Sequence, residues 1–308
     1  MDYVTLIAWT RERIRRISII FWLYRFYLTK KLQLYLHPRY LNWGKTHAGS
    51  ISKPVLSYLE MHLVTHCNFR CRGCSQFSPI AEKWFADTDV HEKDMKQLSN
   101  LFSNINTIRF LGGECLLHPE IDKFIYITRR YFKKANICIA TNGSLIPTMP
   151  ENFWEACRVN HIKLNWTVYP VLVHKKNEIM KRIESKGIIV HAEEALEFRR
   201  ILNLDGDSDQ FYAFKFCRSL LYVPFLQEGK IYMCSRPFVI KYFNKKFGTS
   251  IPEGGHINIH DDSVNGWDIL ISINKSNDTC NYCATNLSNF EWTETKYVAE
   301  EWNSKTNN

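Results

Sequence analysis

The alternation of strand-like and helix-like patterns over residues 56–195 constrains the fold more than any other feature of the sequence. Repeated strand–helix units form a parallel sheet with helical crossovers. The segment is far shorter than the ~250 residues of a closed eight-stranded barrel, so we expect an α/β partial barrel or an open sheet. In both, ligands bind at the C-terminal ends of the strands. The expected strands cover residues 56–64, 107–111, 136–141, 161–169 and 187–192, and the expected helices cover residues 90–103, a segment opened by Pro119, 151–158 and 174–186.

The composition is that of a folded globular protein. Of the 308 residues 45% are hydrophobic, and 13 Gly and 10 Pro are too few for a low-complexity or fibrous chain. The formal net charge of +9 would suit a nucleic acid or an anionic lipid. However, residues 1–40 hold eight basic and two acidic side chains, so the rest of the chain is nearly balanced. We therefore expect no nucleic-acid-binding surface.

The N-terminal segment is basic and aromatic. Its apolar run, residues 17–24, is interrupted by Arg25 and is shorter than the roughly 18 apolar residues of a membrane-spanning helix. No small-residue cleavage site follows, so we expect no signal peptide and a cytoplasmic protein. Residues 11–29 form an amphipathic pattern with a basic and an apolar stripe. Two interpretations remain open: a helix lying peripherally on the inner face of an anionic membrane, or a helix packed on the body.

A loop with three cysteines follows the first expected strand. Cys67, Cys71 and Cys74 have the spacing C-x3-C-x2-C. Three thiolates can ligate three irons of a 4Fe-4S cluster and leave the fourth iron open, whereas a closed structural site needs four ligands. The alternatives are a zinc site with a remote fourth ligand and three buried thiols.

A second set of cysteines lies in the C-terminal third of the chain. Cys217, Cys234, Cys280 and Cys283 can complete either a tetrahedral zinc site or a second 4Fe-4S cluster. The number of ligands does not separate these two. We expect the remaining cysteines to be small buried hydrophobic residues; they are Cys115, Cys138 and Cys157.

The cysteine loop, followed one strand later by Leu111-Gly-Gly-Glu114, resembles the radical S-adenosylmethionine (radical SAM) enzymes. The resemblance implies a partial (β/α)6 barrel, a 4Fe-4S cluster on the three cysteines of the loop, and S-adenosylmethionine as the source of a 5′-deoxyadenosyl radical. It also implies that Glu114 lies near the methionine amino group, and we expect Gly112 and Gly113 to allow close approach of the backbone. Thr141 and Asn142 match a family segment near the ribose; an ordinary turn after a strand is the alternative.

Two positions depart from the family pattern. Gly73 stands where the family usually has an aromatic residue near the adenine, and Cys115 stands where proline is common after the GGE motif. In the C-terminal third, Gly229 to Cys234 resembles the twitch domain, a shortened SPASM auxiliary-cluster domain. This resemblance favours a second 4Fe-4S cluster over zinc. The implied domains are an N-terminal extension (1–50), the partial barrel (51–205), a small twitch-like auxiliary-cluster domain (206–290) and a C-terminal tail (291–308).

A fully ligated auxiliary cluster has no open iron, so its natural role is to accept an electron from the substrate. The cysteine arrangement is most like that of 2-deoxy-scyllo-inosamine dehydrogenase, an aminocyclitol alcohol oxidase. We therefore expect oxidation of a hydroxyl on a sugar or cyclitol, either a small molecule or a lipid-linked saccharide such as a cell-surface glycan precursor. The chemistry also implies a low-potential electron donor such as flavodoxin.

The oxidation needs a base for the hydroxyl proton. The sequence offers Tyr169, Arg236, His118 and Glu193 as candidates, and each has a packing or surface role as its alternative. Two other functions remain open. One is radical modification of a peptide, by thioether formation or epimerisation, and the other is a noncatalytic zinc-binding protein.

Overall fold

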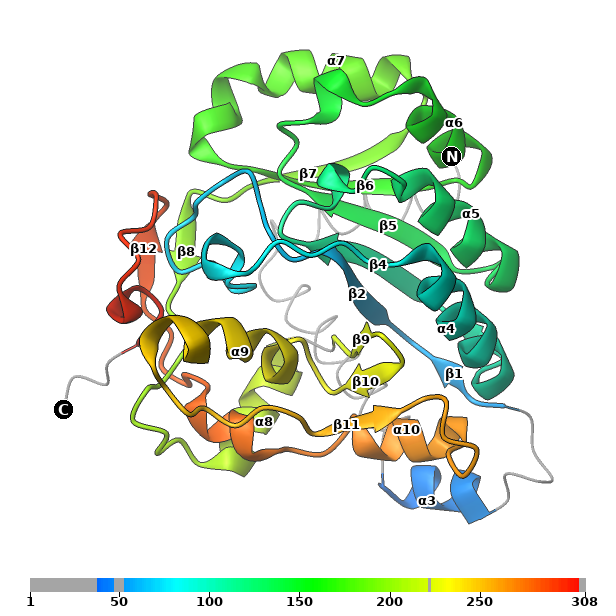
Figure 1. Cartoon of the computed structure of the whole chain (residues 1–308), viewed down its shortest axis with the longest axis vertical. Coiled ribbons are helices and arrows are strands. Elements are labelled where there is room, and N and C mark those ends of the chain that lie inside the picture. The colour runs from blue at the N-terminus through cyan, green and yellow to red at the C-terminus, as the bar shows by residue number, and fades with distance from the viewer. Residues whose placement is uncertain (1–37, 47–52, 221–222, 305–308) are drawn as a thin grey trace, which may run out of the picture. The chain divides into compact units, whose positions relative to one another are not determined.

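The computed structural model describes residues 38–46, 53–220 and 223–304 (Figure 1). One helix, α3 (Pro38–Thr46), belongs to a unit formed by residues 1–51, and residues 52–308 form a second compact unit. The amphipathic segment 11–29, with its expected membrane contact, lies outside the described residues. Among the helices of the described ranges, none has the length and hydropathy that crossing a bilayer requires.

An eight-stranded sheet organises the larger unit, in the order β11-β10-β9-β2-β4-β5-β6-β7. The five strands from β2 to β7 are parallel and adjacent in sequence order, which confirms the α/β class and the parallel sheet. Burial follows the sequence pattern, since all six residues of β2 are buried and β6 alternates between buried and half-buried side chains. These strands are β2 (Leu59–Val64), β4 (Thr107–Gly112), β5 (Asn136–Thr141), β6 (Lys163–Val168) and β7 (Ile189–Glu194).

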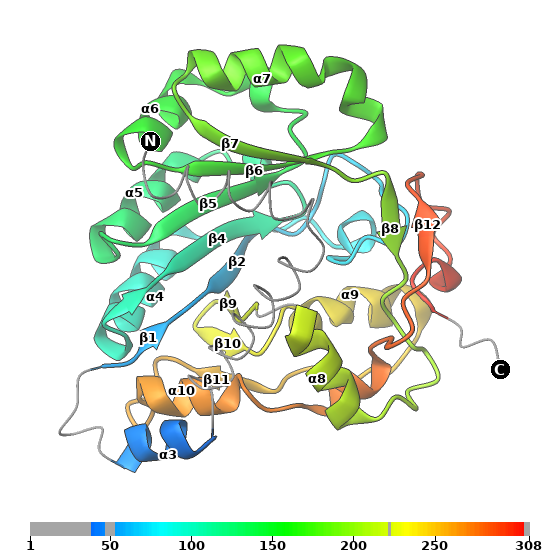
Figure 2. The ribbon, with the colours of Figure 1, turned by 180° about the vertical axis from the view of Figure 1, so that it is seen from behind.

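Four helices connect these parallel strands, and both views show them on one face of the sheet (Figures 1 and 2). The Asp87 carboxylate caps the first of them by accepting from the amides of Asp89 and Val90. Each helix buries an apolar stripe against the sheet, as the periodicity predicts. The four are α4 (Thr88–Leu101), α5 (Ile121–Tyr131), α6 (Glu151–Val159) and α7 (Lys176–Ser185).

The C-terminal region continues the same sheet at its other edge. Strand β9 (Phe225–Gln227) pairs in parallel with β2, so the sixth parallel strand lies beside the first strand and does not follow β7. Antiparallel pairing then adds β10 (Lys230–Tyr232) and β11 (His256–Asn258). The remaining helices of this region are α8 (Gln210–Leu220), α9 (Arg236–Phe247) and α10 (Gly266–Ser272).

Two small sheets complete the architecture. β1 (Val55–Leu56) pairs in parallel with β3 (Asn104–Ile105), and β8 (Glu197–Arg199) pairs antiparallel with β12 (Asn289–Glu291). Short 3-10 helices connect several elements, at Ser78–Ile80, Cys115–Leu117, Ile146–Thr148, Pro170–Lys175, Asp278–Tyr282 and Ala299–Glu301.

The segment predicted as a C-terminal tail is packed against the body as far as the structure describes it. Trp302 is 0% exposed and lies in a cluster with Phe77 and Phe243. Its indole Nε1 donates to the carbonyl of Cys74 at 2.9 Å. We define residues 289–304 as the C-terminal clamp, because they hold the cysteine loop from outside.

Replacing Trp302 with Ala should lower the free energy of unfolding by roughly 3 to 5 kcal/mol, because a buried indole is lost and a cavity remains. The matched control is Val298→Ala in the same segment, whose side chain is 44% exposed; its effect should stay within about 0.5 kcal/mol. Urea denaturation followed by circular dichroism under anaerobic, reducing conditions measures both. If both variants lowered the free energy of unfolding by the same amount, the packing of Trp302 against the body would be contradicted.

Candidate active site

A cavity of about 400 Å³ opens at the C-terminal ends of the parallel strands, where the sequence predicts ligands to bind. Both cysteine sets contribute to its wall, although the C-terminal set lies more than 140 residues from the loop in the sequence. The volume is that of a typical small-molecule site. The cysteines that line the cavity are Cys67, Cys71, Cys74, Cys217, Cys234 and Cys283.

Hydrogen-bond donors surround the sulfurs of the cysteine loop. The Sγ atom of Cys67 accepts from the backbone amide of Phe69 at 3.3 Å and from the Asn142 side-chain amide at 3.6 Å. The Sγ atom of Cys71 accepts from the indole Nε1 of Trp292 at 3.1 Å. Such donors stabilise a thiolate, so the donor set fits cluster ligands.

Burial opposes the thiolate form when no metal is bound. It raises the pKa of both Cys67 and Cys71 to about 12, since the charged form loses its hydration. A bound metal cluster supplies the positive charge that reverses this balance. The two thiols therefore suit a metal centre better than a free nucleophile.

Across the described ranges, no three His, Cys, Asp or Glu side chains converge as a single bound metal ion requires. A 4Fe-4S cluster places each thiolate on a different iron, so its ligands do not meet at one point.

Three of the four C-terminal cysteines line the cavity, namely Cys217, Cys234 and Cys283, and Cys280 does not. Burial raises the pKa of Cys234 to about 12 and that of Cys283 to about 11, while the nearby Arg236 guanidinium opposes both shifts. Cys217 also interacts electrostatically with these two thiols. Cys280 is buried one turn before Cys283, and its Sγ lies 3.8 Å from Asn277 Oδ1.

The two glycines of the GGE motif allow the backbone at the end of β4 to pack closely against the backbone at the end of β2. A Cβ on Gly112 would lie 2.0 Å from the Val64 carbonyl oxygen, and one on Gly113 would lie 1.9 Å from the His66 carbonyl oxygen. Gly112 also has φ +142°. Both residues line the cavity. The observed close approach is between backbone segments of the chain itself, where β2 and β4 end, and the approach of a ligand to these glycines stays a prediction.

Glu114 connects the ends of β4 and β5. Its carboxylate is 0% exposed and accepts from Thr141 Oγ1 at 2.7 Å, from the Asn142 amide at 2.6 Å and from the Leu116 amide at 3.1 Å. Burial raises its pKa to about 7 despite these three donors. The cavity lining includes Thr141 and Asn142 but does not include Glu114. Its place near a methionine amino group stays a prediction.

The sequence predicts Thr141 and Asn142 either as residues of the binding site or as an ordinary turn after a strand, and they have features of both. Asn142 Oδ1 accepts from the backbone amide of Ser144 at 2.9 Å, which is the turn expected after a strand. Its amide nitrogen meanwhile contacts the Cys67 sulfur. Because both residues also line the cavity, the turn places them at the site.

The structure explains the glycine at position 73. Gly73 has φ +60°, and a Cβ there would lie 2.6 Å from the Phe290 ring and 2.9 Å from the Glu301 carbonyl oxygen. The C-terminal clamp therefore occupies the space that a side chain would need. The three remaining cysteines are buried, which confirms their expected packing role; they are Cys115, Cys138 and Cys157.

The structure brings two of the four candidate bases to the cavity. Tyr169 and Arg236 line it, and the Tyr169 ring stacks on Trp292 at 6.2 Å between centroids. His118 is buried elsewhere, with Nε2 2.9 Å from the Ala86 carbonyl oxygen, and Glu193 is exposed on β7. Neither His118 nor Glu193 lines the cavity.

Sequence reasoning missed Glu60, the only carboxylate among the described residues that line the cavity. It is 5% exposed, accepts from the Tyr58 hydroxyl at 3.0 Å and pairs with Arg109 Nη1 at 3.4 Å. Burial raises its pKa above the usual range. The signal in the sequence is a glutamate inside the otherwise apolar strand Leu59–Val64, because a buried charge inside a strand is costly unless it has a partner or a function.

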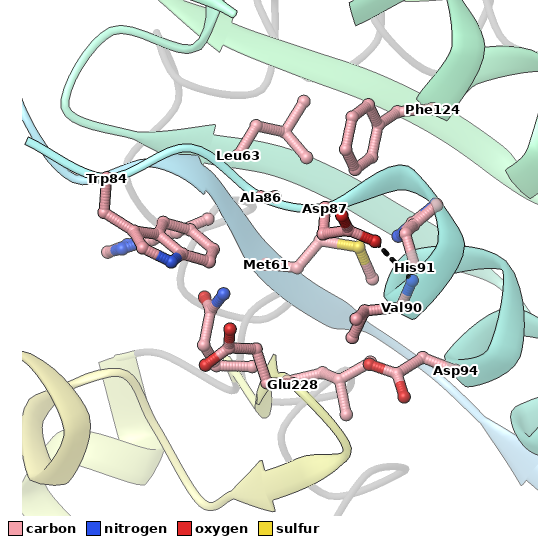
Figure 3. Close-up of a pocket in the computed structure, with 13 residues that line it drawn as sticks. Met61, Leu63, Trp84, Ala86, Asp87, Val90, His91, Asp94, Phe124 and Glu228 are labelled. Carbon is pink, nitrogen blue, oxygen red and sulfur yellow. Dashed lines mark hydrogen bonds between the residues drawn. The ribbon is translucent and has the colours of Figure 1, made fainter.

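A second cavity lies between β2, α4 and the start of the β9–β10 turn (Figure 3). Met61, His91, Asp94 and Glu228 are among its lining residues. Its volume of about 20 Å³ has room for about one water molecule. It is therefore too small to bind a substrate.

Residues 61–201 match the family model described as "Radical SAM superfamily". Among curated proteins, the chain is similar to GTP 3′,8-cyclase of Clostridium botulinum, with 31% identity over 102 residues, which is 33% of this chain and 32% of that protein. GTP 3′,8-cyclase of Sulfurovum sp. is 28% identical over 110 residues, with the same coverage of 33% and 32%. The match thus spans about a third of the length of these relatives.

Two solved structures represent the structural similarities. BtrN in complex with AdoMet and 2-DOIA has a TM-score of 0.47 and 18% identity, covering 75% of this chain and 94% of that one. Native anSMEcpe with bound AdoMet has a TM-score of 0.38 and 17% identity, covering 45% of this chain and 43% of that one.

The buried Glu114 carboxyl predicts a pH dependence of stability. A raised pKa means that the folded state holds the proton more tightly, so this stabilisation is present at low pH and is lost as the pH rises from about 4.5 to about 7. Relative to Glu114→Gln, the metal-free wild type should lose roughly 2 to 3 kcal/mol of unfolding free energy between pH 5 and pH 8. Urea denaturation at several pH values measures this difference.

The matched control for this experiment is the exposed Glu184 on α7. The Glu184→Gln variant should follow the wild-type pH dependence. If Glu114→Gln follows it as well, the buried carboxyl does not carry the raised pKa.

Proposed function

The chain is a member of the radical SAM superfamily, whose domain it carries over residues 61–201, and on this premise we propose that it oxidises a hydroxyl of a sugar or cyclitol. One observation carries the proposal: the three loop cysteines and three of the four C-terminal cysteines line the same cavity. In this arrangement Cys67, Cys71 and Cys74 hold the radical cluster, and the second set holds an auxiliary 4Fe-4S cluster across the cavity. The auxiliary ligands are Cys217, Cys234, Cys280 and Cys283.

The family implies a 4Fe-4S cluster and S-adenosylmethionine, and when bound they supply a radical that abstracts a hydrogen atom from the substrate. Oxidation of a secondary alcohol to a ketone removes a hydrogen atom from carbon, a proton from the hydroxyl and one further electron. The proposed auxiliary cluster is the acceptor of that electron. The remaining requirement is a proton acceptor within the cavity.

Glu60 is the residue that we assign as proton acceptor. A neutral phenol is a poor base, and burial raises the pKa of Tyr169 well above 10. The guanidinium of Arg236 offers hydrogen-bond donors and no acceptor, so it does not serve as a base. The raised pKa of Glu60 makes it a stronger base than an exposed carboxylate, while Tyr58 and Arg109 fix its orientation.

The polar lining of the cavity suits a substrate with several hydroxyl groups. Gln76, Ser78, Thr167 and Arg236 are among the residues that line it. Within the described residues, Ser78 Oγ and Arg236 Nη1 are buried without a hydrogen-bond partner. Buried polar groups of this kind are costly until a ligand satisfies them, so they favour a polar substrate over an apolar one.

The proposal also includes an electron donor, a form of the substrate and a contact with the membrane. A low-potential donor such as flavodoxin supplies the electron that starts each turnover. The substrate is a free or lipid-linked saccharide, and residues 11–29 are the proposed peripheral contact with the inner face of the membrane.

The first test counts iron and acid-labile sulfide per chain after anaerobic reconstitution. The wild type should hold about eight irons, and replacing the three loop cysteines with Ala should leave about four, because one of two four-iron clusters is lost. Replacing Cys217 and Cys234 with Ala should also leave about four. Zinc in place of iron at the C-terminal set would remove the internal electron acceptor and refute the dehydrogenase, but it would leave the radical chemistry intact.

The second test separates hydrogen abstraction from product formation. With 2-deoxy-scyllo-inosamine and scyllo-inositol as probes, the wild type should form one 5′-deoxyadenosine for each oxidised product. In Glu60→Gln, the oxidised product should fall roughly 100-fold while 5′-deoxyadenosine is still formed, because only the proton acceptor is lost.

Glu60→Asp and the exposed Glu197→Gln serve as controls for this test. The first should retain part of the product and the second all of it. Full product formation in Glu60→Gln would remove Glu60 from the mechanism, and 5′-deoxyadenosine without any oxidised product in the wild type would refute oxidation of these probes.

A further inference from the structure

Trp292 makes a contact with the cysteine loop that no sequence motif indicates. Its indole Nε1 lies 3.1 Å from Cys71 Sγ and donates to it, and the two residues are 221 positions apart. A hydrogen bond of this kind stabilises negative charge on the sulfur.

The backbone around Trp292 is fixed on both sides. Its own amide donates to the Leu196 carbonyl at 2.8 Å, directly after the paired strands β8 and β12. Beyond it, the Arg72 amide donates to the Thr293 carbonyl at 2.9 Å, and the Thr295 amide donates to the Arg70 carbonyl at 2.8 Å. Residues 293–295 of the C-terminal clamp therefore pair with residues 70–72 of the cysteine loop through an isolated antiparallel bridge between Cys71 and Glu294.

Side chains hold the indole ring itself. Tyr169 stacks on it with an interplanar angle of 29°, and Phe69 meets the edge of Tyr169 at 5.9 Å. An ion pair between Arg70 and Glu294, at 2.8 Å, ties the loop and the clamp together next to this stack. The indole therefore has little freedom to turn its N–H away from the sulfur.

We propose that Trp292 is a positioning residue that sets the reduction potential of the radical cluster through its hydrogen bond to Cys71. Reduction adds negative charge to a cluster, and a donor to a ligating sulfur stabilises the added charge. The bond therefore raises the potential and makes the cluster easier to reduce. This inference rests on the part of the proposed function that places the cluster on Cys67, Cys71 and Cys74, and it does not depend on the substrate.

The test is an anaerobic redox titration of the reconstituted full chain, followed by electron paramagnetic resonance. The signal that changes on addition of S-adenosylmethionine identifies the radical cluster and separates it from the auxiliary cluster. Trp292→Phe keeps the stacked ring but removes the donor. The ratio of reduced to oxidised cluster at a given potential should fall about tenfold, which corresponds to a shift of ~59 mV to lower potential for one electron.

The direction of the shift in reduction potential shows whether Trp292 acts as a hydrogen-bond donor or only as a packing residue. If Trp292 only shielded the site, its replacement would let water reach the cluster, and hydration of the added charge would raise the potential. Trp292→His, which retains an N–H donor, should return the potential toward that of the wild type. Trp84→Phe replaces a half-buried indole away from the loop and should leave the potential unchanged.

Iron and sulfide content measured on the same samples distinguishes a failure of the Trp292 inference from a failure of the proposed function. An unchanged or raised potential in a fully loaded Trp292→Phe enzyme overturns the role of Trp292 and leaves the proposed function standing. Wild-type protein that takes up no iron on the three loop cysteines overturns both.

Discussion

The pairing of β2 on both of its edges is the constraint on which the rest of the structure depends. On one side β2 pairs in parallel with β4, and on the other it pairs in parallel with β9. The loop that follows β2 carries Cys67, Cys71 and Cys74, and the hairpin that begins with β9 leads directly to Cys234. One buried strand therefore brings two cysteine sets from distant parts of the chain to a common cavity, and it also contributes Glu60 from its own side chains.

The cavity combines three kinds of charge control. The thiols of Cys67 and Cys71 lose hydration in the folded chain, so a bound metal would favour their thiolate form. Arg236 lies near Cys234 and Cys283, and Arg109 pairs with Glu60 at the interior of the sheet. In the oxidation that we propose, the electron and the proton go to different acceptors on the cavity wall.

Local patterns in the sequence predicted the parts of this structure that depend on near neighbours. The five parallel strands, the crossover helices and the buried Cys115 follow from periodicity and residue type. The place of β9 could not be predicted, since three residues carry no usable period and their pairing with β2 is set by tertiary packing. Glu60 was missed because its neighbours read as an ordinary core strand, and the contact of Trp292 with Cys71 joins residues that no local pattern relates.

The distance along the chain between the cysteine loop and the C-terminal clamp has a consequence for biogenesis. A ribosome releases residues 67–74 long before it makes Trp292 and Trp302, and N-terminal segments fold first during synthesis. Until the clamp emerges, the loop lacks the strand-like partner, the ion pair and the indoles that enclose it. The loop therefore gains these contacts only when the last described residues have been synthesised, so its final conformation is completed late.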